Sequence, residues 1–193
     1  MKYELMAWHP FTGERVTIVM SEFVHKAYQF AKKSHEGQKR KYSGEPYINH
    51  PVEVMQIVST VPHTEEMLAA ALLHDVVEDC GVQLQEIFDT FSPNVCYMVN
   101  DLSDVSSPED GNRATRKAKD RNWIAGAKAR SKTIKLADLI SNSRSIVKYD
   151  KEFARVYIKE KELLLELLTE GDATLYAMAK QIVEEAKKEL GIN

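Results

Sequence analysis

The stretch MLAAALLHDVVEDC at residues 67–80 places a group of polar side chains at the end of an apolar segment. Its first seven residues are all apolar, which is typical of a helix buried on every side. His74, Asp75, Glu78 and Asp79 then follow within six positions. Burying such groups without partners is costly, so we expect this end of the segment to border a functional site.

The segment is predicted to be one helix over residues 64–79, with Thr64 as its N-cap. On a continuous helix, residues four apart share a face, so His74 lies above Glu78 and Asp75 above Asp79. A metal ion would neutralise these carboxylates and use the imidazole as a ligand. The alternative is an exposed acidic helix end, which the helix dipole disfavours.

Helical periodicity extends through most of the remaining chain. Ser21 suits the N-cap position of a helix over residues 22–35. Loops are expected at 37–51 and 103–113. The short apolar stretch TIVM at residues 17–20 suits a strand or a packed arm, and no convincing apolar–polar alternation predicts strands elsewhere. The predicted fold class is all-α, with residues 1–20 as an N-terminal extension packed on a single domain of residues 21–193. Further helices are predicted at 52–61, 84–91, 94–102, 113–131 and 131–147, and two more within 152–190 that separate near Glu170-Gly171.

The composition indicates a soluble globular protein. Of its 193 residues, 44% are apolar and 28% are charged, with a net charge of −3 and a pI near 6.1. This balance argues against a nucleic-acid partner, and no apolar run is long enough for a membrane span. The N-terminus lacks the apolar core of a signal peptide, and Cys80 and Cys96 suit reduced thiols, so a cytoplasmic location is expected. The oligomeric state stays open between monomer and homodimer.

A divalent ion needs more ligands than the His74-Asp75 pair provides. His50 directly precedes a proline that suits the first turn of a helix, and Asp138 stands in the apolar stretch IKLADLISN. The alternatives are a loop histidine and a surface or hydrogen-bonded aspartate. His35 is a competing ligand, for which we favour a structural role.

Three segments together carry a family resemblance: RKYSGEPYINHP (40–51), AALLHDVVED (70–79) and IKLADLISNSR (134–144). They resemble the HD phosphohydrolase superfamily, and within it the hydrolase domain of RelA/SpoT-type alarmone enzymes and the stand-alone small alarmone hydrolases of the metazoan SpoT homologue type. The resemblance covers roughly residues 21–165. It implies an HD-domain helical bundle with a metal site between helices.

The resemblance also implies a cofactor and a catalytic pair. The family binds one Mn²⁺ through two histidines and two aspartates, although another divalent transition metal would suit the same ligands. Glu78 and Asp79 match the pair that positions and activates the attacking water. The positions that match the metal ligands are His50, His74, Asp75 and Asp138.

The implied substrate is guanosine tetra- or pentaphosphate, (p)ppGpp, whose 3′-pyrophosphate would be released to leave GDP or GTP. Arginine suits stacking on a base and lysine suits contact with a phosphate. The alternatives are a solvated basic loop around Arg40 and a core role for Tyr47. The positions that match substrate-binding residues are Arg40, Lys41, Tyr47, Asn142, Arg144 and Ser145.

Departures from the family pattern leave other functions open. Tyr42 resembles an insertion that would re-aim Arg40 and Lys41, and Leu139 stands where a cation often follows the fourth ligand, so a cation near the site is expected to be missing. The adenosine counterpart (p)ppApp, or another phosphorylated nucleotide such as NADPH with its 2′-phosphate, is an alternative substrate. A nucleotide-binding sensor is the non-enzymatic alternative. The basic segment 113–131 is either a phosphate-attracting rim or a solvated helix face.

Overall fold

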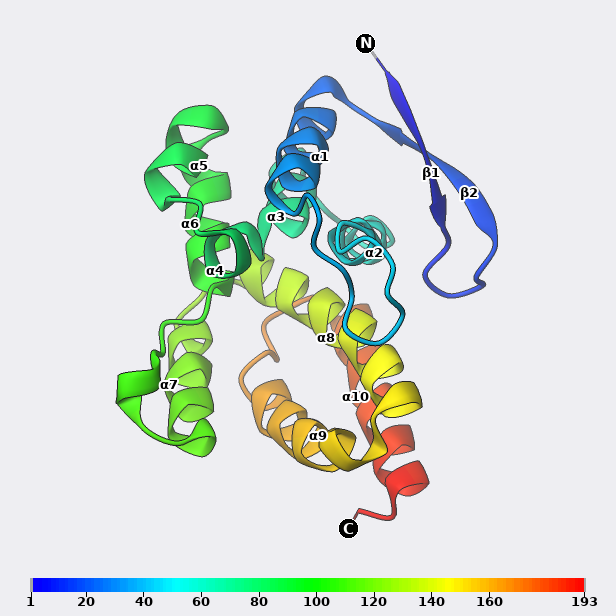
Figure 1. Cartoon of the computed structure of the whole chain (residues 1–193), viewed down its shortest axis with the longest axis vertical. Helices are drawn as coiled ribbons and strands as arrows, with labels where there is room; N and C mark the ends of the chain where they lie inside the picture. Colours follow the sequence, from blue (N-terminus) through cyan, green and yellow to red (C-terminus); the bar gives the residue numbers. More distant parts are fainter. Residues whose placement is uncertain (1, 193) are drawn as a thin grey trace. The chain divides into compact units, whose positions relative to one another are not determined.

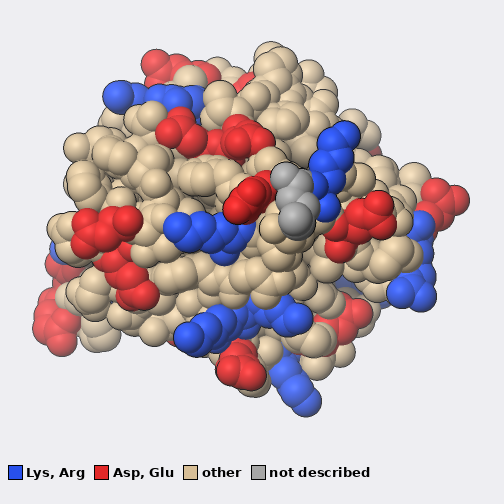
Figure 2. Space-filling model, turned by 90° about the horizontal axis from the view of Figure 1, so that it is seen from above, with Lys and Arg blue, Asp and Glu red and all other residues tan. Residues whose placement is uncertain are grey.

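The computed structural model describes residues 2–192, which form two compact units that divide between Ser103 and Asp104. Helices make up most of both units, which confirms the predicted all-α class (Figure 1). Within residues 2–192, no helix is both long and apolar enough to cross a membrane. Lysine and arginine side chains are interspersed with acidic ones on the face displayed in Figure 2.

The first unit is built around one apolar helix. Helix α3 packs on α1, α2 and α6, and its residues 69–73 are completely buried. This matches the uninterrupted apolar sequence of that stretch. The elements of the unit are β1 (Tyr3–Trp8), β2 (Arg15–Met20), α1 (Glu22–Ser34), α2 (Asn49–Val58), α3 (Glu65–Leu73), α4 (Val76–Cys80), α5 (Leu84–Thr90) and α6 (Pro93–Leu102).

The second unit places its longest helix, α8, against α9 and α10, which also pack on each other. The predicted break near residues 170–171 is confirmed. A Cβ atom on Gly171 would lie 2.7 Å from Leu136 Cδ1, so only glycine fits this close approach to α8. The elements are η1 (Pro108–Asp110), α7 (Arg113–Ala125), α8 (Ala129–Tyr149), α9 (Lys151–Leu165) and α10 (Ala173–Leu190).

The N-terminal residues form an antiparallel hairpin, so the strand alternative for residues 17–20 is confirmed within β2, while the strand over residues 3–8 was not predicted. Tyr3 pairs with Met20 and Trp8 pairs with Arg15, and the hairpin contacts α1 and α2. Burial alternates along β1, yet the outward residues Met6 and Trp8 are apolar and 55% and 57% exposed. Residue type therefore does not follow the strand period, which hid the strand from pattern analysis. The single domain over residues 21–193 stays a prediction.

The predicted helix caps are confirmed. Ser21 Oγ accepts a hydrogen bond from the Val24 amide at 3.3 Å, and Thr64 Oγ1 accepts one from the Met67 amide at 3.3 Å. Gly81 ends α4 at a φ of +70°, which side-chain-bearing residues rarely adopt. These local signals position the ends of the helices that carry the candidate site.

The predicted continuous helix over residues 64–79 is wrong. Helix α3 ends at Leu73 and α4 begins at Val76, with His74 and Asp75 between them. His74 Nδ1–H donates a hydrogen bond to the Ala71 carbonyl at 2.8 Å. A continuous helix would offer that carbonyl to the amide of Asp75, so the side chain competes with the helical ladder. The pairs His74–Glu78 and Asp75–Asp79 therefore do not lie on the face of one continuous helix.

Candidate metal centre

His50, His74 and Asp75 form a compact cluster in the first unit. Asp75 Oδ2 lies 3.1 Å from His74 Nε2 and 3.6 Å from His50 Nε2. One potential ligand atom from each residue lies within 4.8 Å of the others, and both histidines are only 2% exposed. Two buried imidazoles and a partly exposed carboxylate therefore face one another.

The ends of three helices position the three side chains. His50 is the second residue of α2, and His74 and Asp75 lie at the junction of α3 and α4. Because His74 Nδ1–H donates to the Ala71 carbonyl, the neutral ring leaves Nε2 as the atom with a lone pair, on the side of Asp75. The local hydrogen bond that interrupts the helix thus also aims the imidazole.

This donor set fits a divalent transition metal. Imidazole nitrogen and carboxylate oxygen are suitable ligands for Mn, Fe or Zn, and the backbone bond of His74 is the kind of support that metal-binding histidines have. Among residues 2–192, only this cluster brings three or more histidine, cysteine or acidic side chains close enough together to hold an ion. The cluster is a possible metal site, and the identity of its metal belongs to the proposal below.

Tyr47 is attached directly to the cluster. Its hydroxyl donates a hydrogen bond to Asp75 Oδ2 at 2.8 Å and also interacts with the side chain of Asp79. Burial and the two carboxylates raise the pKa of Tyr47 well above its ordinary value, so the phenol keeps its proton. Burial and the charge of Asp75 also raise the pKa of Asp79.

A second group of side chains lies behind Tyr47. The His35 ring stacks on the Tyr47 ring with centroids 4.7 Å apart, and His35 Nδ1 lies 2.8 Å from Gln38 Oε1. Gln38 Nε2 donates to the Asp79 carbonyl at 3.1 Å, and Cys80 Sγ lies 3.2 Å from His35 Nδ1. His35 therefore has neighbours of its own, in line with the structural role favoured for it. Sequence analysis missed Gln38 and gave Cys80 no role.

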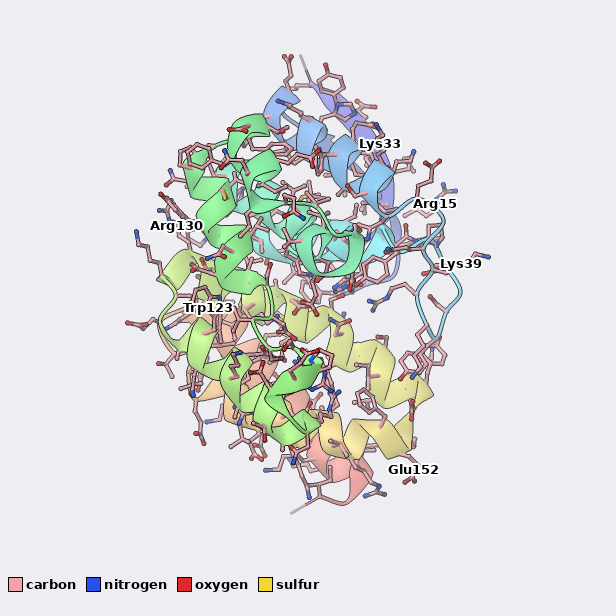
Figure 3. All side chains as sticks on the ribbon, turned by 60° about the vertical axis from the view of Figure 1, so that its left-hand side comes forward. Arg15, Lys33, Lys39, Trp123, Arg130 and Glu152 are labelled. Atoms are coloured by element: carbon pink, nitrogen blue, oxygen red, sulfur yellow. The ribbon has the colours of Figure 1, made fainter. Side chains whose placement is uncertain are left out.

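The loop between α1 and α2 carries the predicted substrate-binding cations. Backbone hydrogen bonds close it, from Arg40 N to Glu45 O at 2.8 Å and from Tyr47 N to Gln38 O at 3.0 Å. The Arg40 guanidinium lies over the Tyr47 ring, 5.9 Å from its centroid. Lys41 is exposed, and the Lys39 side chain projects outward from the loop (Figure 3).

The remaining predicted residues lie on α8 in the second unit. Asp138 Oδ1 accepts a hydrogen bond from Asn142 Nδ2 at 2.6 Å, and Asp138 Oδ2 lies 3.2 Å from Lys135 Nζ. The expectation that a cation near Asp138 is missing is therefore wrong, since Lys135 takes that place from one helical turn earlier. Ser145 Oγ donates to the Asn142 carbonyl at 3.0 Å, and Arg144 is exposed.

Lysines outside the predicted substrate-binding set lie near Asp138 or near one another. Loss of hydration and the charges of Lys135 and Lys117 lower the pKa of Lys161 to about 8. The charges of Asp138 and Asp104 act in the opposite direction and raise this pKa. Three helices, α7, α8 and α9, thus bring cations near one another. The spacing of Lys135 and Asp138 on one helix could have revealed the first of these cations, but only the packing of the unit reveals Lys117 and Lys161.

The structure brings together part of the predicted site. Tyr47, His50, His74, Asp75 and Asp79 meet in the first unit, and Glu78 is exposed on α4. Asp138 and the residues around it belong to the second unit, so their participation in the same site stays a prediction.

Comparisons with known proteins identify the family to which the chain belongs. Residues 27–164 match the model of the HD domain. The chain is 36% identical over 136 residues, 69% of its length, to a guanosine-3′,5′-bis(diphosphate) 3′-pyrophosphohydrolase of Vibrio cholerae, of which it covers 19%. It is 38% identical over 121 residues, 61% of its length, to a Drosophila melanogaster protein of the same enzyme name, of which it covers 66%. The chain thus spans less than two thirds of the length of these relatives.

Solved structures extend the likeness to most of the chain. The structure of a metazoan ortholog of SpoT, described as hydrolysing ppGpp, superimposes with a TM-score of 0.76 at 28% identity, over 90% of this chain and 98% of that one. A protein from Listeria monocytogenes has the same fold, with a TM-score of 0.61 at 22% identity over 77% of this chain and 99% of that one. These matches confirm the resemblance identified from the three sequence segments.

Proposed function

Because the chain belongs to the HD domain family, we propose that it is a metal-dependent phosphohydrolase that removes the 3′-pyrophosphate of guanosine tetra- or pentaphosphate. The products are GDP or GTP and pyrophosphate. The observation that carries the proposal is the buried cluster of His50, His74 and Asp75, with Asp79 beside it. Relatives named as 3′-pyrophosphohydrolases support this choice of substrate.

In this proposal, Mn²⁺ is held by His50, His74 and Asp75, with Asp138 as the fourth ligand. The donor set and the fixed orientation of His74 support metal binding by the first three. When bound, the metal supplies charge neutralisation and acidifies a water molecule. Asn142, which donates to Asp138, holds that carboxylate in one orientation.

Glu78 and Asp79 handle the proton of the attacking water. Asp79 lies beside Asp75 and shares the Tyr47 hydroxyl with it, and a carboxylate held in this way can accept a proton from water. Glu78 is exposed on the same short helix, so it is accessible to solvent and substrate. A protein that only binds the nucleotide would not need these two residues.

Cations in the α1–α2 loop suit a polyphosphate substrate. Arg40 offers a planar group for the base, and Lys41 is exposed for contact with phosphate. Clustered cations attract a ligand with four or more negative charges.

The test is hydrolysis of a panel of nucleotides by the purified, Mn²⁺-loaded protein. The panel contains guanosine and adenosine nucleotides with a 3′-pyrophosphate, together with NADPH, and pyrophosphate and orthophosphate are measured separately. We expect pyrophosphate release from the guanosine compounds. Faster hydrolysis of the adenosine compounds, or orthophosphate release from NADPH, would show that the protein acts on one of these alternative substrates instead. Tight nucleotide binding without turnover would instead indicate a sensor.

A further inference from the structure

We propose that Tyr47 is a positioning residue of the metal cluster, held in place by His35 and Gln38, rather than a residue that contacts the nucleotide. This inference rests on the proposed function only in taking His50, His74 and Asp75 as metal ligands. The chain of contacts that supports it lies entirely within the first unit, between the α1–α2 loop and the end of α4.

The first contact of the chain is with a predicted metal ligand. The Tyr47 hydroxyl donates to Asp75 Oδ2 at 2.8 Å, and the same oxygen faces the Nε2 atoms of both histidines. A carboxylate oxygen has two lone pairs, so one can accept the phenol proton while the other points to a metal. The hydroxyl therefore fixes the rotation of the carboxylate toward the imidazoles.

The second contact fixes the ring of Tyr47. The His35 ring lies nearly parallel to it, at an interplanar angle of 29°, and His35 is only 3% exposed. Gln38 Nε2 donates to the Asp79 carbonyl, which leaves Gln38 Oε1 to accept from His35 Nδ1–H. The amide of Gln38 thus orients the imidazole, and the imidazole supports the tyrosine from behind.

The third contact joins the loop to α4. Gln38 accepts a backbone hydrogen bond from Tyr47 N at 3.0 Å, while its side chain reaches the Asp79 carbonyl and the Cys80 sulfur. Cys80 Sγ also lies against His35 Nδ1. Gln38 therefore ties the base of the loop with Arg40 and Lys41 to the helix that carries the predicted catalytic pair.

In this arrangement the Tyr47 hydroxyl is hydrogen-bonded to the metal cluster. The hydroxyl donates to Asp75, the Tyr47 ring stacks on His35, and the Arg40 guanidinium lies 5.9 Å from the ring centroid. Partners in this outer position orient metal ligands, and their loss typically costs about 10- to 100-fold in metal affinity or activity. A nucleotide contact would instead act on substrate affinity alone.

The experiment measures Mn²⁺ affinity of the metal-free protein by calorimetry, in the absence of nucleotide. Tyr47→Phe keeps the ring and its stacking and removes only the hydroxyl. We expect its Mn²⁺ affinity to fall by about 10- to 100-fold. The matched control is Tyr97→Phe, which removes a phenol hydroxyl from an exposed position on α6 of the same unit and is expected to leave the affinity unchanged.

Gln38→Leu provides the second arm. It is expected to weaken Mn²⁺ binding by less than Tyr47→Phe does, and to add little when combined with it, because both changes act through the same hydroxyl. Thermal unfolding of each variant checks that the unit is folded. If the losses of Mn²⁺ affinity in the two single variants simply add in the double variant, the chain of contacts through Gln38 is contradicted. The Tyr47→Phe result alone would then still decide the role of the hydroxyl.

The outcomes separate this inference from the proposed function. Wild-type Mn²⁺ affinity in Tyr47→Phe, with a raised KM, would overturn the positioning role and assign Tyr47 to the nucleotide. Normal Mn²⁺ binding by the wild-type protein without hydrolysis of any nucleotide would overturn the proposed function alone. A wild-type protein that binds no Mn²⁺ would overturn the metal assignment and the positioning role together.

Discussion

The metal cluster and the Arg40–Lys41 loop lie in the same unit and are built in opposite ways. Both histidines of the cluster are 2% exposed, and neighbouring backbone or side chains restrain His74 and Asp75. The loop exposes Lys41 and is closed mainly by backbone hydrogen bonds at its base. The proposed metal ligands are thus restrained by their neighbours, whereas the side chains proposed to contact substrate stand on a more exposed loop.

The largest expected effect comes from removing a cluster imidazole. His74→Ala deletes both the predicted ligand atom and the hydrogen bond to the Ala71 carbonyl. We expect metal content after dialysis and pyrophosphate release to fall to background, as measured by elemental analysis and a phosphate assay. His63→Ala, a change of the same type at a histidine that bonds only a nearby carbonyl, serves as the control. Retained metal in His74→Ala would exclude His74 as a ligand.

The next effect separates proton handling from metal binding. Glu78→Gln and Asp79→Asn should leave metal content nearly unchanged and lower kcat by about 10²- to 10⁴-fold, the usual contribution of a positioned acid–base group. Asp138→Ala should reduce both metal content and activity. Metal analysis and steady-state kinetics on the same preparations check this division. Equal metal loss in all three variants would show that it is wrong.

A smaller effect is expected in the loop. Arg40→Ala and Lys41→Ala should each raise KM roughly tenfold with kcat and Mn²⁺ affinity kept, because uniform binding energy is removed. Lys39→Ala is the matched control, since this exposed side chain projects outward from the same loop (Figure 3). If all three changes raise KM equally, the effect is general electrostatic attraction, and specific roles for Arg40 and Lys41 are excluded.

The smallest effect concerns stability and extends the comparison to the second unit. The pKa of Lys161 lies at about 8 in the folded protein, below its ordinary value of 10.5, so the charged form is disfavoured by folding. Lys161→Met should therefore raise the free energy of unfolding by about 1–2 kcal/mol near pH 7. The unfolded chain binds the extra proton between pH 8 and 10.5, so the gain should shrink as pH rises through that range.

Denaturant melts of the wild type and of Lys161→Met at pH 7 and at pH 10 would measure this difference. Lys159→Met, a change at an exposed lysine two positions earlier on α9, controls for loss of surface charge. A gain that is the same at both pH values would show that burial of the Lys161 charge does not limit stability.

Local features of the sequence determined much of the fold. Ser21, Thr64 and Gly81 mark helix ends because capping depends on residues within one turn. The motif residues that resemble the HD domain fall in three short segments, each recognisable from its own sequence, so the family could be identified without coordinates. One strand of the N-terminal hairpin was nevertheless missed, and the continuous helix over residues 64–79 was wrong. The hairpin has apolar residues on its exposed face, and His74 interrupts the helix by bonding to the preceding turn.

Tertiary structure decided which side chains meet. The contact of Tyr47 with Asp75 spans 28 positions, and that of His35 with Cys80 spans 45. No local period or cap encodes such a pair, because the approach depends on how α1, α2 and α3 pack. The same is true of Lys117 and Lys161, whose charges meet only when separate helices assemble. By itself the sequence determined the residue types of the candidate metal centre, and packing decided which neighbours orient them.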